Sequence, residues 1–165
     1  MIEALKRNLL PRGIGKLLSG SKWVSGGAIL TDPDGKILLV KSRLRNSWEY
    51  PAGGSTGRES PLEACRREVE EETGLNPAAY RMIGVDFFHM HTPNGNLLFT
   101  FAADVSHEEA EGIKIDKFEL MDSRWVTRAE ALTLIAPRLH DRFEQLLKAL
   151  DDERPVYLHT GHSVV

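Results

Sequence analysis

The segment GGSTGRESPLEACRREVEEETGL, residues 53–75, carries the strongest structural signal in this chain. Its C-terminal part predicts a helix from Pro61 to Thr73, since proline suits the first helical position. Ser60 can cap the first turn, and Glu63 completes a capping box with it. Gly74 then ends the helix as a left-handed residue. Both ends of this helix are therefore fixed by local sequence.

The helix carries acidic side chains on one stripe. At 100° per residue, three glutamates fall within an arc of roughly 100°, namely Glu68, Glu71 and Glu72. A neighbouring apolar stripe that can pack on a sheet contains Leu62, Cys65 and Val69. Clustered carboxylates repel one another unless a cation lies between them, and hard divalent ions prefer such oxygen ligands. A solvated acidic face is the alternative, and the helix considered alone favours it.

The wider segment decides between these interpretations. It fits the pattern G-x5-E-x7-R-E-U-x-E-E-x-G-U, where U is aliphatic, at every defined position from Gly53 to Leu75. This pattern resembles the signature box of the Nudix hydrolases. The resemblance extends over residues 23–150, since the flanking hairpins and the strand Arg124-Trp125-Val126 stand where that family has them.

The resemblance implies an α/β protein with the Nudix fold, a mixed and partly parallel β-sheet sandwiched between α-helices. The box would form a loop, the helix and a second loop. The activity implied is metal-dependent hydrolysis of a diphosphate linkage in a nucleoside diphosphate bound to another moiety. Mg²⁺, or Mn²⁺ in its place, is the implied cofactor.

The resemblance also implies roles for individual residues. Three glutamates match the metal ligands of the family: Glu68, Glu71 and Glu72. The backbone carbonyl of Ala52, or that of Gly53, would add an oxygen, because glycine lets the loop approach an ion closely. Glu59 and Arg67 match the pair that fixes the helix to the loop, so we assign them, with Gly53, an orienting role. Arg58 departs from the glycine frequent at its position.

The general base remains open between two regions. Glu68 is one candidate, on the box helix. Several family members instead use an acid from a later loop, and this chain has there Glu108, Glu109, Glu111, Asp116 and Glu119. We favour Glu119, because apolar Phe118 and Leu120 could anchor it near the site. The alternative is a solvated surface acid.

The rest of the chain predicts alternating strands and helices around the box. We expect strands at Val24–Leu30, Lys36–Val40, Arg81–Met90, Leu97–Val105 and Met121–Val126, and helices beginning after Thr127 and at Pro137. We expect a polar loop over residues 41–58 and an acidic stretch over residues 107–111. Residues 1–22 are interpreted as a basic helix and linker, residues 23–150 as the Nudix domain, and residues 151–165 as a C-terminal tail.

Composition narrows the possible partners. With 21 basic and 24 acidic residues the net charge is −3, which gives no support for nucleic-acid binding or for attraction to an anionic membrane. No apolar run approaches the ~20 residues of a membrane span. The single cysteine, Cys65, is expected in the core and suits a reducing cytoplasm. His89 and His91 could face a substrate, and His159 with His162 has loose metal spacing, but packed or exposed histidines are the simpler interpretation.

The residues before the box narrow the range of candidate substrates. Glu49-Tyr50-Pro51-Ala52-Gly53 resembles the E-x-P-A-G approach of family members that act on ADP-ribose and related nucleotide sugars. Nucleoside triphosphates and dinucleoside polyphosphates stay open as alternatives. A non-catalytic nucleotide sensor is a further alternative, although the intact acidic positions disfavour it. A prenyl diphosphate isomerase is disfavoured by the position of Cys65. The resemblance also allows a homodimer.

Overall fold

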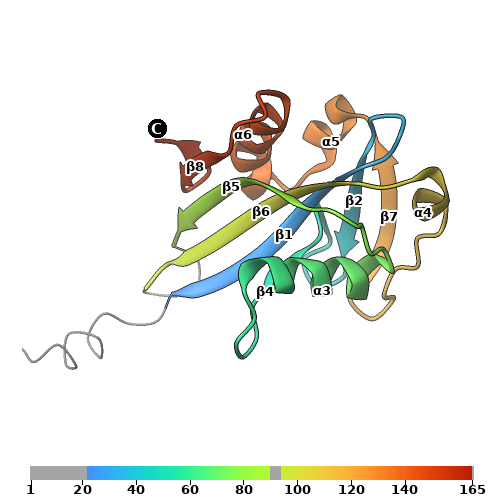
Figure 1. Ribbon diagram of the computed structural model, residues 1–165, viewed down its shortest axis with the longest axis horizontal. Helices are drawn as coiled ribbons and strands as arrows, with labels where there is room; N and C mark the ends of the chain where they lie inside the picture. Colours follow the sequence, from blue (N-terminus) through green and yellow to red (C-terminus); the bar gives the residue numbers. More distant parts are fainter. Residues whose placement is uncertain (1–21, 90–93, 165) are drawn as a thin grey trace, which may run out of the picture.

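The computed structural model describes residues 22–89 and 94–164, and within them a mixed sheet lies between helices on its two faces (Figure 1). The strands are β1 (Trp23–Thr31), β2 (Ile37–Ser42), β3 (Ser47–Glu49), β4 (Ala52–Gly54), β5 (Arg81–Phe88), β6 (Asn96–Asp104), β7 (Leu120–Val126), β8 (Val156–His159) and β9 (His162–Ser163). The helices are α3 (Pro61–Thr73), α4 (His107–Glu111), α5 (Arg128–Leu134) and α6 (His140–Asp151), with the 3₁₀ turn η1 (Pro137–Leu139) before α6. The predicted fold class is confirmed. No helix within these residues is long and apolar enough to span a membrane.

Strand β1 is the centre of the sheet. Along one edge it pairs in parallel with β6 over its whole length, from Trp23 opposite Asn96 to Thr31 opposite Asp104. Its other edge is divided, because β4 pairs antiparallel with residues 25–27 whereas β2 meets β1 only at Thr31. The path through the sheet is β3-β2-β1-β6-β5-β8-β9, with β7 beside β2. Strands β2 and β4 thus leave β1 at different points, and their diverging ends form part of the site described below.

Two apolar clusters cover the two faces of the sheet, because side chains alternate along each strand. On one face α3 packs against Ala28 and Leu30 of β1 through Cys65 and Val69. On the opposite face, where Figure 1 shows α5 and α6, Ile29 of β1 belongs to a cluster with residues of α5, η1 and α6. The last helical segments face this cluster through Leu139, Phe143 and Leu146, which are buried, while Leu150 is partly buried.

The structure contains short elements that the sequence patterns did not predict. The predicted polar loop 41–58 contains β3 and β4, which have three residues each and are too short to show an alternating pattern. The acidic stretch 107–111 is the helix α4, opened by a capping box between Ser106 and Glu109. The segment treated as a tail adds β8 and β9, and β8 pairs in parallel with β5. Of the basic helix and linker predicted at residues 1–22, residues 1–21 lie outside the described residues, as does His91.

Helix α3 lies unusually close to β1 because of a glycine. A Cβ atom placed on Gly26 would stand 2.0 Å from the carbonyl oxygen of Pro61 and 2.8 Å from the backbone nitrogen of Cys65. Both contacts are with helix backbone, so no side chain could move aside to relieve them. The absence of a side chain at residue 26 therefore sets the distance between the box helix and the sheet.

We predict that Gly26→Ala lowers the free energy of unfolding by at least about 2 kcal/mol, because the helix must shift away from β1. Urea denaturation monitored by circular dichroism would measure this loss. The matched control is Ser25→Ala in the same strand, for which we expect a change below about 0.5 kcal/mol. Equal stability of Gly26→Ala and the wild-type protein would show that the helix is not held at this distance by the glycine.

Candidate active site

The ends of α3 are built as the local sequence predicts. The Ser60 hydroxyl accepts a hydrogen bond from the Glu63 amide at 3.3 Å, and the Glu63 carboxylate accepts one from the Ser60 amide at 2.8 Å. Gly74 has φ +72° and donates its amide hydrogen to the Glu70 carbonyl. These caps fix the start of the helix, and the start determines which side chains share a face.

The Arg67 side chain connects α3 to the loop that precedes it. Its guanidinium donates to both carboxylate oxygens of Glu59, at 2.8 and 3.1 Å, and to the Gly54 carbonyl at 2.9 Å. It also donates to Glu68 at 2.7 Å and to Glu71 at 3.0 Å. The hydrogen bonds from Arg67, with those from Thr56, lower the pKa of Glu59 to about 2. One side chain therefore joins the loop to the acidic face of the helix.

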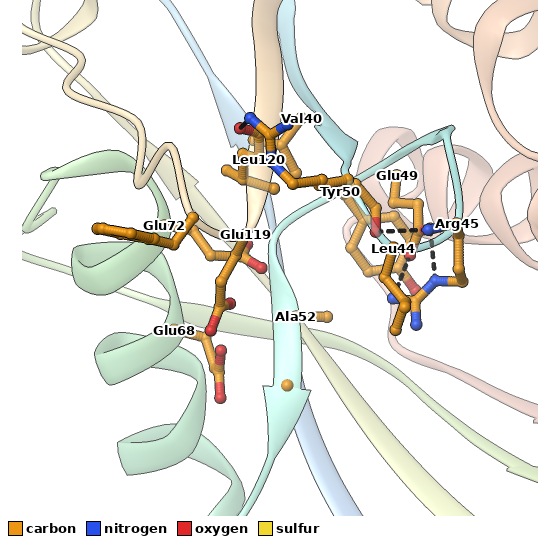
Figure 2. Close-up of a pocket in the computed structure, with 14 residues that line it drawn as sticks. Val40, Leu44, Arg45, Glu49, Tyr50, Ala52, Glu68, Glu72, Glu119 and Leu120 are labelled. Atoms are coloured by element: carbon orange, nitrogen blue, oxygen red, sulfur yellow. Dashed lines mark hydrogen bonds and ion pairs between the residues drawn. The ribbon is translucent and has the colours of Figure 1, made fainter.

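Four carboxylates line one cavity, and three of them, which come from two distant parts of the chain, lie together on one side of it. Glu68 and Glu72 reach it from α3, and Glu119 reaches it from the loop before β7. Figure 2 shows these acids on one side of the cavity, with Arg45 and Glu49 on the other. The cavity has a volume of about 530 Å³ and opens where β2 and β4 diverge, since Val40 and Ala52 also line it.

Burial makes this group of carboxylates electrostatically unfavourable. Burial, followed by the charges of Glu68, Glu119 and Glu49, raises the pKa of Glu72 to about 8. One Glu72 oxygen, Oε2, is buried and has no hydrogen-bond partner among residues 22–89 and 94–164. Burial also raises the pKa of Glu68, although Arg67 opposes the change. Such a group is more stable with a proton or a cation bound than without one.

The predicted ligand set is only partly assembled. Ala52 and Gly53 line the cavity beside Glu68 and Glu72, whereas Glu71 does not line it, and its 60% exposed side chain is bonded to Arg67. Over residues 22–89 and 94–164 no three acidic, histidine or cysteine side chains are arranged tightly enough to hold an ion. The hydrogen bonds of Arg67 to Glu68 and Glu71 account for this arrangement.

Gly53 is required by the position of a carboxylate. A Cβ atom on this residue would lie 2.0 Å from the carboxyl carbon of Glu68 and 2.1 Å from its Oε1. The Glu68 carboxylate is thus packed directly on the β4 backbone. A side chain at residue 53 would push that carboxylate out of its place.

Glu119 is positioned by its backbone and by one neighbour. Its carbonyl accepts a hydrogen bond from the Arg43 amide at 2.8 Å, and its amide donates to the Asp116 carbonyl at 3.2 Å. Leu120 is 3% exposed and anchors the loop, as predicted. Phe118 is 91% exposed, so the predicted anchoring by this residue is wrong.

A second cavity of about 300 Å³ adjoins the first. The two share the wall formed by Arg45, Glu49, Tyr50, Ala52 and Gly53. Glu49 accepts hydrogen bonds from Arg45 at 2.8 Å and from Arg138 at 2.7 Å. The second cavity is otherwise lined mainly by Phe88, Leu98 and Leu139, with Arg142. Sequence reasoning missed both arginines. The Arg138 contact spans 89 residues and leaves no local pattern, whereas Arg45 is only four residues from Glu49 and this spacing was a signal that could have found it.

The other reactive side chains lie away from this site. Cys65 is fully buried between α3 and the sheet, and burial raises the pKa of its thiol to about 12, so the predicted core position is confirmed. His89 is exposed and contacts the ring of Phe87 edge-on. His159 and His162 face each other across β8 and β9.

The comparisons with known proteins agree with this architecture. The family model described as NUDIX domain matches residues 22–149, and the chain belongs to this family. An RNA pyrophosphohydrolase of Halorhodospira halophila is 40% identical over 58 residues, which are 35% of this chain and 32% of that protein. The chain thus matches about a third of the length of this curated relative.

Solved structures share the fold at low sequence identity. A MutT protein from Methanosarcina mazei superposes with a TM-score of 0.66 at 22% identity, over 77% of this chain and 94% of that one. The NUDIX domain of Shewanella oneidensis NrtR, crystallised with ADP-ribose, superposes with a TM-score of 0.65 at 18% identity. This superposition covers 93% of this chain and 98% of the NrtR domain.

The raised pKa of Glu72 predicts a pH-dependent stability. In the unfolded chain this carboxyl ionises near its ordinary pKa, but in the folded protein it does so near pH 8. The proton therefore stabilises the fold fully below about pH 4.5, and this stabilisation is lost as the pH rises through 8. With chelator present, we expect Glu72→Gln to match the wild-type protein at pH 5 and to exceed its free energy of unfolding by on the order of 3 kcal/mol at pH 8.5.

Urea denaturation at these two pH values measures the difference. Glu70→Gln is the matched control, because Glu70 is an exposed acid on the same helix and should give no such gain. If the free energy of unfolding has the same pH dependence in the wild-type protein and in Glu72→Gln, the pKa of Glu72 is not raised by the fold.

Proposed function

We propose that this protein hydrolyses a diphosphate linkage in a nucleoside diphosphate joined to another moiety, with ADP-ribose or a nucleotide sugar as the favoured substrate. The observation that carries the proposal is the convergence of Glu68, Glu72 and Glu119 on one cavity, with a Glu72 oxygen that has no hydrogen-bond partner. Membership of the NUDIX domain family supports the same reaction.

The residues present fit a divalent cation. The donors are carboxylate oxygens, one of them unsatisfied, and hard ions such as Mg²⁺ or Mn²⁺ prefer such donors. Glu68 and Glu72 would hold the ion with the carbonyl of Ala52, and Glu71 would join them on release from Arg67. When bound, the metal would neutralise phosphate charge and lower the pKa of the attacking water.

The protein side chains would prepare the reaction in two ways. Arg67 would hold Glu68 in place through the hydrogen bond at 2.7 Å, while Glu59 fixes the other side of the guanidinium. Glu119 would accept the proton of the attacking water, because it reaches the cavity from the loop before β7 and belongs to no ion pair within residues 22–89 and 94–164. Glu68 is the alternative base, but Arg67 already occupies one of its oxygens.

The preference for ADP-ribose or a nucleotide sugar has three supports. The segment from Glu49 to Gly53 has the E-x-P-A-G sequence and forms the wall between the two cavities. Two adjoining cavities suit a substrate with groups on both sides of a diphosphate. The NrtR domain, similar in fold, was crystallised with ADP-ribose. A cytoplasmic location is part of this proposal, because the one cysteine is a buried free thiol.

A substrate panel tests the proposed function. It should contain ADP-ribose, nucleotide sugars, nucleoside triphosphates, dinucleoside polyphosphates and a 5′-triphosphorylated RNA, the last because of the name of the curated relative. We expect release of a nucleoside monophosphate from ADP-ribose or a nucleotide sugar, abolished by chelator and restored by Mg²⁺ or Mn²⁺. Glu72→Gln and Glu71→Gln should each lower kcat at least about 100-fold, whereas Glu70→Gln should not.

Two results would contradict this proposal. Hydrolysis that survives exhaustive chelation would exclude the metal-dependent reaction. Binding of these nucleotides without turnover of any of them would favour the alternative of a non-catalytic nucleotide sensor.

A second pair of variants assigns the general base. If Glu119 accepts the proton, Glu119→Gln should lower kcat about 100-fold or more and leave metal binding unchanged, since base catalysis contributes on the order of 10²–10⁴-fold. Calorimetric titration with Mn²⁺ monitors the metal, and Glu108→Gln, an exposed acid on α4, is the control. Full kcat in Glu119→Gln, with loss of kcat in a Glu68→Gln variant that still binds Mn²⁺, would assign the role to Glu68.

A further inference from the structure

Two large apolar side chains are exposed at the cavity that holds the carboxylates. Leu44, between β2 and β3, is 89% exposed, and Phe118, before β7, is 91% exposed. Both line this cavity, and both stand in charged surroundings, between Arg43 and Arg45 and between Lys117 and Glu119. Leu44 lies on the Arg45 side of the cavity in Figure 2, away from the three acids. Apolar surface is thus offered at the site where a substrate would enter.

The two loops that carry these side chains are tied together. The Arg43 amide donates to the Glu119 carbonyl at 2.8 Å. Its guanidinium donates to the Lys117 carbonyl through Nε at 3.2 Å and through Nη2 at 2.9 Å. Arg43 precedes Leu44, and Phe118 lies between Lys117 and Glu119, two of the residues whose carbonyls accept from Arg43. The backbones beside both apolar side chains are therefore held in fixed positions, which lowers the entropy lost when a ligand contacts them.

We propose that Phe118 stacks on the nucleobase of the substrate, with Leu44 as a second apolar contact at the same cavity, so that these two residues select substrates that carry a base. This inference rests on the proposed function, because it places the base beside the carboxylates assigned to the diphosphate. An exposed aromatic ring suits the flat face of a base and binds it without sequence-specific hydrogen bonds. A bare sugar would need hydrogen-bond donors and acceptors, and neither side chain provides any.

A protein partner fits this surface less well. A stable protein interface buries about 800 Å² on each partner, far more than two side chains provide. Met121, which is 38% exposed, follows three residues after Phe118 on β7, whereas Met82 on β5 and Tyr157 on β8 belong to other strands. The exposed apolar side chains that line this cavity are thus few, which suits a small ligand group better than a protein surface.

Equilibrium binding tests the inference independently of turnover. Calorimetry in buffer with Mg²⁺ would compare two probes, ADP, which carries a base, and inorganic pyrophosphate, which does not. We expect Phe118→Ala to weaken ADP binding roughly 5- to 100-fold, the range for loss of one stacked base, and to leave pyrophosphate binding unchanged. Phe118→Trp should retain ADP binding. The matched control is Tyr157→Ala, which removes an exposed aromatic side chain from β8, away from the cavity.

Each result has a definite meaning. Equal weakening of ADP and pyrophosphate would overturn the inference, because Phe118 would then act only by holding the Glu119 loop. Unchanged binding of both probes, or failure of the wild-type protein to bind ADP, would also overturn it. For a substrate that the panel identifies, Phe118→Ala should raise KM with kcat within about twofold. A panel without any turnover would reject the proposed function, while the ADP titration would still decide the role of Phe118.

A 5′-triphosphorylated dinucleotide RNA serves as an additional probe. Dependence on Phe118 for ADP alone would assign the stacked base to a small nucleotide. If the RNA binds more tightly than ADP and its binding also depends on Phe118, the stacked base belongs to the end of an RNA chain. Both results support base stacking and differ only in its source.

Discussion

The hydrogen bonds of the Arg67 guanidinium are the interaction on which the site depends. Three carboxylates and the Gly54 carbonyl accept from this one cation. Two of those carboxylates, Glu68 and Glu71, belong to a helical stripe that would otherwise repel itself, and the third belongs to the loop before the helix. Arg67 thus reduces the electrostatic strain of the helix and sets the distance between α3 and β4, because a planar guanidinium can bind several oxygens in fixed directions.

Close contact between backbones makes this arrangement possible. Gly26 lets α3 lie directly on β1, and Gly53 leaves room for the Glu68 carboxylate against β4. If either residue had a side chain, the carboxylates would lie farther from the diverging ends of β2 and β4. The site is therefore determined by the absence of atoms at two positions as much as by the acids themselves.

The grouping of carboxylates lowers the stability of the fold when no cation is bound. Glu72 is buried among other acids, which raises its pKa to about 8 and disfavours the charged form in the folded protein. An apolar or amide side chain would be more stable at this position in the absence of a ligand. Retention of an unfavourable carboxylate is understandable when a cation or proton relieves it in the working protein. Perturbed acids in a cavity are typical of functional sites for this reason.

The sequence by itself determined α3, its caps at Ser60 and Gly74, and the residues on each of its faces, because these depend on hydrogen bonds and side-chain spacing within about four residues. Only the tertiary structure decided that Glu119 lies with Glu68 and Glu72, that Glu71 turns away to Arg67, and that the last residues join the sheet as β8 and β9. These outcomes depend on strand pairing and packing between distant segments, such as β7 beside β2. No local pattern encodes such partners, since the free energy that selects them is gained only when the whole sheet has formed.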